Sequence, residues 1–284
     1  MNTNLYSLGL MSGTSLDGVD VSIIKSDGEQ YLEIIDNLYL KYDIQLKSKL
    51  KKIVNLCKTK NQLIKATKEI KEVEKELTLY HVNAYKLITK KNKKIKINLI
   101  GFHGQTILHK PKKGYTIQIG DSKLLSKMTN ITVVSNFREN DILNGGQGAP
   151  LTPIYHQLIL SKIKSKLPLA LINIGGISNI TYIKNDNELV GFDTGPGNYL
   201  IDRWVKTKTK KEFDNNGLIA KSGQTNSKIL KKLLKNPYYK KKFPKSLDVK
   251  EFNLKILSRL SLEDGCATLS MLTAKSICMA LNSF

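Results

Sequence analysis

The chain has 284 residues, of which 46 are lysine or arginine and 24 are acidic, so its formal net charge is +22. This length suits one large domain or two of ordinary size, and the 40% of hydrophobic residues suffice for a core. The sequence lacks an apolar run of about eighteen residues and a signal-like start, which predicts a cytoplasmic protein without a membrane partner. Three scattered cysteines without metal-site spacing predict reduced thiols and no protein-bound metal.

The positive charge raises the question of a nucleic-acid partner, because phosphate backbones attract lysine and arginine. All but three of the basic residues are lysines, whereas arginine is preferred for bidentate contacts with phosphate and bases. The lysines accompany many isoleucines and asparagines, a combination typical of AT-rich coding. We therefore interpret lysine runs such as 90–94 as solvated surface and expect no specific nucleic-acid partner.

The first half of the chain alternates strand and helix patterns. Three strand patterns open it as a meander that begins with a hairpin: 5–11, 19–24 and 31–39. Residues 45–91 then place apolar side chains three or four positions apart, which predicts helices. A short helix near 122–128 lies among three further strand patterns: 97–102, 115–119 and 131–135. This alternation predicts an α/β fold.

The second half repeats the opening theme after a glycine-rich connector, 144–150, which we take as the region of the domain boundary. Strands are predicted at 169–174 and 180–183, joined by a tight turn at 175–179, and a further strand at 189–193. The glycine-rich tips of the first hairpins thus occupy matching places in the two halves. This match indicates an internal duplication.

Glycine-rich hairpin tips can present backbone N–H groups to an anion, because no side chain blocks its approach. An ordinary hairpin turn is the simpler explanation of one such tip, but two tips at matching positions favour a phosphate site. The hydroxyls of Thr14, Ser15 and Ser178 would add donors. The chain has no GxxxxGK[ST] motif, which disfavours a P-loop NTPase.

Two aspartates lie near these tips. Asp17 is within the first hairpin, and Asp193 ends a predicted strand just before a glycine-rich helix start. A carboxylate in the position of Asp193 can act as a base or hold Mg²⁺ through water. From that segment alone, Asp193 could equally be a structural residue that caps the turn or the helix.

Polar residues also follow the predicted strand 97–102. His103 and Thr106 would then lie at a strand end, where α/β proteins gather ligands, and their type suits a sugar. Arg138, one of only three arginines, can grip a carboxylate through two hydrogen bonds. Its alternative is a structural ion pair with Glu139 or Asp141.

Six motifs occur in the first 198 residues: GLMSGTSLDGVD (9–20), GFHGQT (101–106), QIGD (118–121), NFREND with GGQGAPL (136–141 and 145–151), NIGGISN (173–179) and GFDTGPGN (191–198). In this order they closely resemble the anhydro-N-acetylmuramic acid kinases. The match is specific, because it rests on several segments spread along the chain rather than on one glycine loop.

The resemblance implies the fold of actin, hexokinase-like sugar kinases and heat-shock ATPases: two duplicated ribonuclease H-like domains that flank a nucleotide and sugar cleft. The first actin-like domain would span 1–137, with its phosphate hairpin at 9–20. The second would span 138–284, with its hairpin at 173–181. The implied enzyme is a cytoplasmic sugar kinase that uses ATP and Mg²⁺ as cofactors. Family members look dimeric, so the resemblance also implies a homodimer.

The implied reaction belongs to peptidoglycan recycling and amino sugar catabolism. Water opens the 1,6-anhydro ring of anhydro-N-acetylmuramic acid while ATP phosphorylates O6, giving N-acetylmuramate 6-phosphate. By motif, Asp193 corresponds to the general base, and Thr106, Arg138 and His103 correspond to sugar contacts. The residues assigned to the nucleotide are Gly13, Thr14, Ser15, Leu16, Asp17, Gly18, Val19 and Asp20 in the first hairpin, and Gly175, Gly176 and Ser178 in the second.

Family members usually continue past the position of Phe284 with a glycine-rich CGGGxxN-type segment that helps to hold the adenosine. The resemblance therefore predicts a C-terminally shortened chain and an incomplete second domain. Two hypotheses follow from it. The chain is a working kinase, or it is a truncated, catalytically impaired remnant that binds only sugar or nucleotide.

Overall fold

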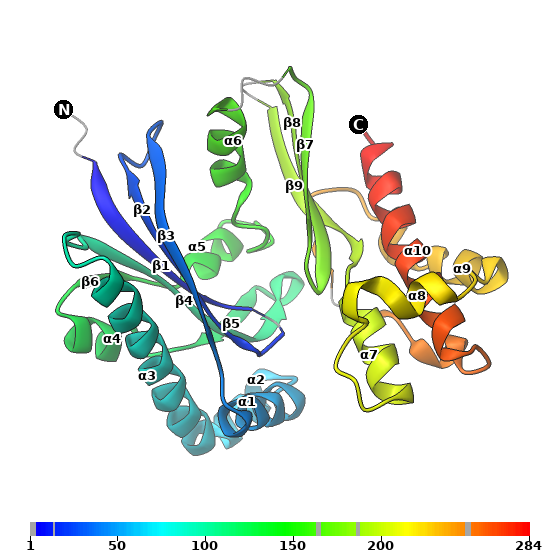
Figure 1. Cartoon of the computed structure of the whole chain (residues 1–284), viewed down its shortest axis with the longest axis horizontal. Helices are drawn as coiled ribbons and strands as arrows, with labels where there is room; N and C mark the ends of the chain where they lie inside the picture. Colours follow the sequence, from blue (N-terminus) through cyan, green and yellow to red (C-terminus); the bar gives the residue numbers. More distant parts are fainter. Residues whose placement is uncertain (1–3, 14, 163–165, 186–187, 248–250) are drawn as a thin grey trace. The chain divides into compact units, whose positions relative to one another are not determined.

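The computed structural model describes the whole chain apart from residues 1–3, 14, 163–165, 186–187 and 248–250. The chain divides into two compact units, Met1–Gly148 and Ala149–Phe284, and each contains both helices and strands (Figure 1). This composition confirms the predicted α/β class. Among the described residues, no helix combines the length and apolar character needed to cross a membrane.

The first unit is built on a mixed sheet in the order β3–β2–β1–β4–β5, and β6 also pairs with β4. The strands are β1 (Leu5–Ser12), β2 (Gly18–Ser26), β3 (Leu32–Lys41), β4 (Leu99–Lys110), β5 (Tyr115–Ile119) and β6 (Thr132–Val134). β1 pairs antiparallel with β2, and β2 with β3, as the meander pattern predicts. β4 lies parallel to both β1 and β6, which makes the sheet mixed.

Helices of the first unit cover this sheet with their apolar stripes. They are α1 (Ile44–Leu56), α2 (Lys60–Lys65), α3 (Thr67–Lys91), α4 (Ser122–Thr129) and α5 (Phe137–Leu143), with a single 3₁₀ turn, η1 (Pro111–Lys113). α1 begins where the Asp43 carboxylate accepts the Leu46 N–H at 2.7 Å, an N-cap bond. The buried side chains of α1 and α3 recur three or four positions apart and join one core with those of β1, β2 and β4.

β4 is longer than the predicted strand, so the expectation that His103 and Thr106 follow a strand end is wrong. The strand continues because β5 pairs with its second half. The pairing of β4 with β1 skips His103: Leu10 faces Phe102 and Met11 faces Gly104, which is a β-bulge. Gly104 has a φ of 66°, a conformation that favours glycine.

Residues 138–148 belong to the first compact unit, whereas the resemblance places the domain boundary at 137/138, which stays a prediction. α5 packs against β5, and the Arg138 side chain bonds to His103 of β4. These contacts attach the segment to the first sheet. The division falls within the glycine-rich connector, 144–150.

The second unit contains a three-stranded antiparallel sheet in the order β7–β8–β9. Its strands are β7 (Leu169–Ile174), β8 (Ile177–Asn185) and β9 (Glu188–Pro196). The turn between β7 and β8 is only Gly175–Gly176, so Ser178 lies in β8 rather than in the predicted loop. Asp193 likewise lies within β9 and not at its end. Each unit thus has a glycine-tipped hairpin and a third antiparallel strand, while the duplication itself stays a prediction.

The long helix α10 packs against most of the other helices of the second unit. The helices are α6 (Pro153–Lys162), α7 (Tyr199–Lys208), α8 (Leu218–Ser222), α9 (Ser227–Leu234) and α10 (Leu262–Leu281), with 3₁₀ turns η2 (Asn215–Gly217), η3 (Pro237–Lys240) and η5 (Leu254–Leu257). α10 contacts α7, α8, α9 and β9. Gly265 lets α10 approach the Trp204 indole, because a Cβ at Gly265 would overlap that ring. The Trp204 indole N–H donates to the Leu262 carbonyl at 3.1 Å.

Candidate active site

The tip of the β1–β2 hairpin is a compact polar turn. The Leu16 N–H donates to the Gly13 carbonyl at 3.2 Å, and the Ser15 hydroxyl donates to Asp17 Oδ1 at 2.6 Å. The Tyr42 N–H donates to the Asp17 carbonyl at 2.9 Å and closes the base of the turn. The predicted contact Thr14 lies outside the described residues.

Three residues assigned to this loop belong instead to β2. Gly18, Val19 and Asp20 pair with β1 or β3, so their backbone groups serve the sheet. Val19 is fully buried, and a Cβ at Gly18 would overlap the Leu40 carbonyl. Glycine is therefore required at position 18 by strand packing, and the nucleotide roles of Gly18 and Val19 stay predictions.

Asp20 remains available to a ligand because its side chain is exposed. Desolvation and the neighbouring Asp17 carboxylate raise the pKa of Asp20. A cation beside Asp17 and Asp20 would offset the charge repulsion that contributes to the raised pKa of Asp20. Asp17 and Asp20 are therefore the acidic pair of the first hairpin.

A buried hydrogen-bond network lies at the end of β1, next to this hairpin. The Ser12 hydroxyl bonds to the Tyr42 hydroxyl and, at 3.1 Å, to His81 Nε2, while His81 Nδ1 bonds to the Leu77 carbonyl at 2.8 Å. A carbonyl only accepts, so Nδ1 carries the proton and Nε2 accepts from Ser12. Ser12 in turn accepts from Tyr42. Burial lowers the pKa of His81 to about 4 and raises that of Tyr42, so both stay neutral near pH 7.

His103 and Arg138, both predicted sugar contacts, are bonded to each other. Arg138 Nε donates to His103 Nε2 at 2.8 Å, and Arg138 Nη1 donates to the Gly148 carbonyl at 2.6 Å. His103 Nδ1 donates to the Gly104 carbonyl at 2.8 Å, so both ring nitrogens have protein partners. Burial, with a contribution from the Arg138 charge, lowers the pKa of His103 to about 4. His103 is thus a neutral imidazole that orients the guanidinium.

Thr106, the third predicted sugar contact, is half-buried on β4. Gln118 of β5 donates from Nε2 to Thr106 Oγ1 at 3.1 Å and to Thr116 Oγ1 at 2.7 Å. Because Thr106 Oγ1 accepts this bond, its hydroxyl hydrogen is oriented away from Gln118 and can donate elsewhere. The QIGD motif thus supports the GFHGQT motif through a side-chain contact.

The second hairpin tip is bound to the GFDTGPGN segment by backbone hydrogen bonds. The Gly175 carbonyl accepts from Asn198 N at 2.8 Å, and the Gly176 carbonyl accepts from Gly197 N at 3.0 Å. The Gly175 N–H donates to the Ile177 carbonyl at 3.2 Å, so it is already used within the turn. Ser178 is fully buried, and its hydroxyl has no hydrogen-bond partner among the described residues.

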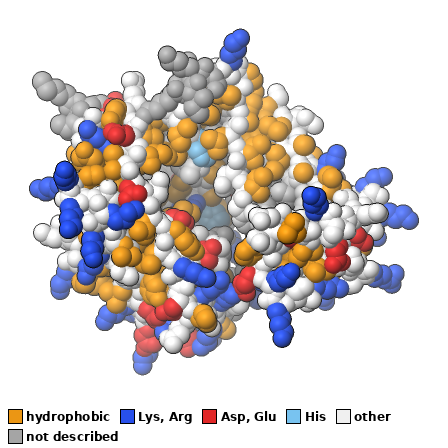
Figure 2. Space-filling model, viewed as in Figure 1, with side chains coloured by type: hydrophobic (Ala, Val, Ile, Leu, Met, Phe, Trp, Pro, Cys, Tyr) orange, Lys and Arg blue, Asp and Glu red, His pale blue; other side chains and the backbone are white. Residues whose placement is uncertain are grey.

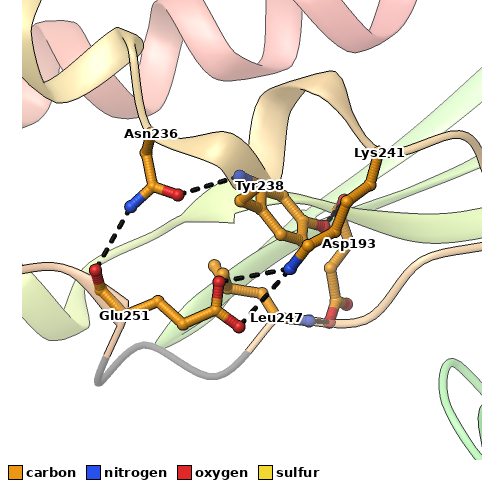
Figure 3. Close-up of polar contacts among 6 residues, drawn as sticks. All are labelled: Asp193, Asn236, Tyr238, Lys241, Leu247 and Glu251. Atoms are coloured by element: carbon orange, nitrogen blue, oxygen red, sulfur yellow. Dashed lines mark hydrogen bonds and ion pairs between the residues drawn. The ribbon is translucent and has the colours of Figure 1, made fainter. Parts of the chain in front are cut away.

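Asp193, the predicted general base, is held on β9 by residues that follow α9 (Figure 3). Its side chain is 7% exposed, and its Oδ2 accepts the Leu247 N–H at 2.8 Å. The Asp193 N–H donates to the Lys245 carbonyl at 3.0 Å, and the Asp193 carbonyl accepts the Tyr238 hydroxyl. Burial and the nearby Asp193 charge raise the pKa of Tyr238, which keeps its hydroxyl a donor.

Ser12, Tyr42, His81 and Tyr238 could not be identified as site residues from the sequence. Ser12 lies in the motif at 9–20, but its neighbours do not distinguish a buried serine from a loop serine. Tyr42, His81 and Tyr238 lie in segments without a motif, and their partners are distant along the chain. On the face drawn in Figure 2, lysine and arginine side chains are interspersed with acidic and apolar ones. The absence of a specific nucleic-acid partner stays a prediction.

Together, the mixed α/β units, the glycine-tipped hairpins and the buried aspartate on β9 are consistent with a sugar kinase fold. The family model described as anhydro-N-acetylmuramic acid kinase matches residues 5–284. The chain belongs to the anhydro-N-acetylmuramic acid kinase family, which confirms the resemblance carried by the six motifs. Membership of a kinase family implies use of ATP.

Curated relatives with this same name agree. The protein from Pelagibacter ubique is 43% identical over 284 residues, which cover 98% of this chain and 76% of the relative. The protein from Zymomonas mobilis is 41% identical over 285 residues, which cover 99% of this chain and 78% of the relative. The protein from Rhizobium etli is 39% identical over 274 residues, covering 95% and 74%. These matches give no support to an impaired remnant, while C-terminal shortening stays a prediction.

Proposed function

We propose that this chain is an ATP-dependent kinase that opens the anhydro ring of anhydro-N-acetylmuramic acid with water and phosphorylates O6. The observation that carries the proposal is Asp193, a buried aspartate within GFDTGPGN whose carboxylate orientation is fixed by the Leu247 N–H. The family match and the names of the relatives support the choice of sugar. The setting would be peptidoglycan recycling in the cytoplasm.

In this proposal Asp193 is the general base. It takes a proton from water, whose oxygen forms a bond to the anomeric carbon as the bond from that carbon to O6 breaks. O6 receives the γ-phosphoryl group of ATP, and ADP leaves. A positioned base contributes about 10²–10⁴ to such a rate, and the rest comes from orientation and charge neutralisation.

The phosphates of ATP would meet the first hairpin at Gly13 and residues 15–17, which lie between β1 and β2 and outside the sheet. Mg²⁺ would arrive bound to the nucleotide, and Asp17 and Asp20 would meet its water shell, because this ion prefers carboxylate and water oxygens. Bound with the nucleotide, Mg²⁺ would neutralise phosphate charge. Gly175, Gly176 and Ser178 of the second hairpin would contact nucleotide phosphate.

The sugar would be met by Arg138 and Thr106. Arg138 is oriented by the His103 ring and the Gly148 carbonyl, and its charge suits the lactyl carboxylate of the sugar. The Thr106 hydroxyl can donate to a sugar oxygen while Gln118 holds it. His103 acts on the sugar through Arg138 in this arrangement, since both of its ring nitrogens are bonded to protein atoms.

A coupled ADP-release assay tests the proposal on the purified 284-residue chain. We expect ADP release with ATP, Mg²⁺ and anhydro-N-acetylmuramic acid, and only background release when the sugar is left out. No sugar-dependent release from a protein shown to be folded would contradict the proposed activity. Equilibrium binding of sugar or nucleotide by that same inactive protein would favour the alternative of a binding remnant.

A further inference from the structure

One segment, residues 238–247, makes three hydrogen bonds to a single residue of β9. We call it the base clamp. Its Tyr238 hydroxyl donates to the Asp193 carbonyl, its Lys245 carbonyl accepts the Asp193 N–H, and its Leu247 N–H donates to Asp193 Oδ2. Both backbone groups of Asp193 and one carboxylate oxygen are therefore fixed by the same stretch of chain. Figure 3 shows the bonds from Tyr238 and Leu247.

The sheet alone holds Asp193 weakly. Among the strands that the structure describes, β9 is at the edge of its sheet and pairs with β8 alone. The pairing skips Thr194: Asn179 faces Asp193 and Ser178 faces Gly195, so a β-bulge follows directly after Asp193. Bulges loosen the ladder locally and redirect neighbouring side chains. The base clamp supplies the hydrogen bonds that another strand would otherwise provide at the outer edge.

Tyr238 is itself firmly held. It is fully buried, and its N–H donates to Asn236 Oδ1 at 2.9 Å. The ammonium groups of Lys241 and Lys245 each lie 4.9 Å from the centroid of its ring. Lys241 also pairs with Glu251 at 3.2 Å, which ties the base clamp to the chain beyond it. Because these contacts hold the Tyr238 ring in place, its hydroxyl determines the position of the Asp193 carbonyl.

We propose that Tyr238 is a positioning residue for the base Asp193, acting through the backbone of β9 and not through contact with substrate. This inference rests on the proposed function, because it assigns Tyr238 a role in that same reaction. Misplacement of a reacting group by about 1 Å can cost as much as a hundredfold in rate. Loss of one of three bonds should therefore lower turnover without abolishing it.

The first test is Tyr238→Phe, which keeps the ring and removes only the donor. We expect kcat to fall about tenfold, with the KM values for ATP and sugar within about twofold of wild type. Tyr239→Phe is the matched control, since it makes the same change at the next residue, whose buried hydroxyl lies beside Gly195. Equal kcat values for Tyr238→Phe and wild type would overturn the proposal.

A double-mutant cycle separates positioning from general damage. In the Asp193→Asn background there is no base left to position, so adding Tyr238→Phe should change the residual turnover less than about twofold. A further tenfold loss in that background would show that Tyr238 acts independently of Asp193 and would overturn the proposal.

An NMR titration gives a readout that does not need turnover. The Leu247 amide donates to Asp193 Oδ2, so its shift reports the ionisation of that carboxyl group. We expect Tyr238→Phe to move the inflection of the Leu247 amide titration and Tyr239→Phe to leave it in place. An unmoved inflection in Tyr238→Phe would overturn the proposal. If wild type releases no ADP, the proposed function fails, and this titration still decides whether Tyr238 positions Asp193.

Discussion

The two units anchor their functional loops in different ways, although both use a buried tyrosine hydroxyl. In the first unit, the Tyr42 hydroxyl bonds to Ser12 at the end of β1, and Ser12 makes a second hydrogen bond to His81. In the second unit, Tyr238 bonds to the backbone of Asp193 itself. The first anchor is a chain of neutral side chains beside the turn, and the second fixes the residue that would perform the chemistry.

This difference separates two kinds of sensitivity. The first anchor contains a buried imidazole that must stay neutral, so the free energy of unfolding should decrease as the pH is lowered. The second anchor surrounds a carboxylate, so changes there should alter turnover before they alter folding. Variants that change turnover and leave the free energy of unfolding unchanged, or the reverse, would distinguish the two anchors.

The largest effect should come from Asp193→Asn, which keeps the shape of the side chain and removes the base. We expect turnover to fall by about 10²–10⁴, while ATP binding and the midpoint of thermal unfolding stay close to wild type. Steady-state ADP release and a thermal melt measure the two properties. A variant that retains most of its turnover would show that another group takes the proton.

The next effect should come from Arg138→Ala, which removes a guanidinium oriented by His103 and Gly148. We expect the apparent KM for the sugar to rise about tenfold to a hundredfold, because bonds to a charged group contribute roughly 1.5–3 kcal/mol. The KM for ATP should change much less. A larger change in the KM for ATP would move Arg138 to the nucleotide side of the site.

A smaller effect should appear as acid sensitivity of folding. The pKa of His81 is lowered from 6.5 to about 4 by burial, so only the unfolded chain gains this proton as pH falls from 6.5 towards 4. The free energy of unfolding should therefore decrease by about 2 kcal/mol between pH 7 and 5 from this group. Denaturant melts of wild type and His81→Gln measure it, and parallel pH dependences of the two proteins would contradict the assignment.

The smallest effect should come from Tyr42→Phe, which removes the donor to Ser12 and keeps the ring. We expect the free energy of unfolding to fall by about 1–2 kcal/mol, because Ser12 loses one partner in a buried site. The same change at Tyr238 should act mainly on kcat. Urea melts beside steady-state kinetics of the two variants would show whether the two anchors differ as described.

Several elements could be predicted because their patterns are local. The meander β1–β3 and the helices α1 and α3 follow from alternation or from three- and four-residue spacing. β4 could not be predicted in full, since the polar residues 103–106 interrupt its apolar pattern, and its second half pairs with β5. Ser178 was misassigned to a turn for a similar reason, as its strand begins directly after two glycines.

The candidate site was predicted as a set of motifs but not as a set of contacts. Asp193 and Arg138 were identified by their motifs, and the structure adds the groups that hold them. The sugar contact of His103 stays a prediction, and the structure adds that the His103 ring accepts a hydrogen bond from Arg138. The nucleotide contact of Gly18 likewise stays a prediction, and the structure adds that strand packing requires glycine there.

The sequence by itself determined the α/β class, the order of the hairpins and the family, because these depend on residue types and spacings along the chain. Tertiary structure alone decided which polar groups are buried, which glycines are required by packing and which segment holds Asp193. The physical reason is distance along the chain: Tyr238 and Leu247 are 45 and 54 residues from Asp193. Hydrogen bonds between such distant residues leave no periodic signal in sequence, and only the folded chain brings them together.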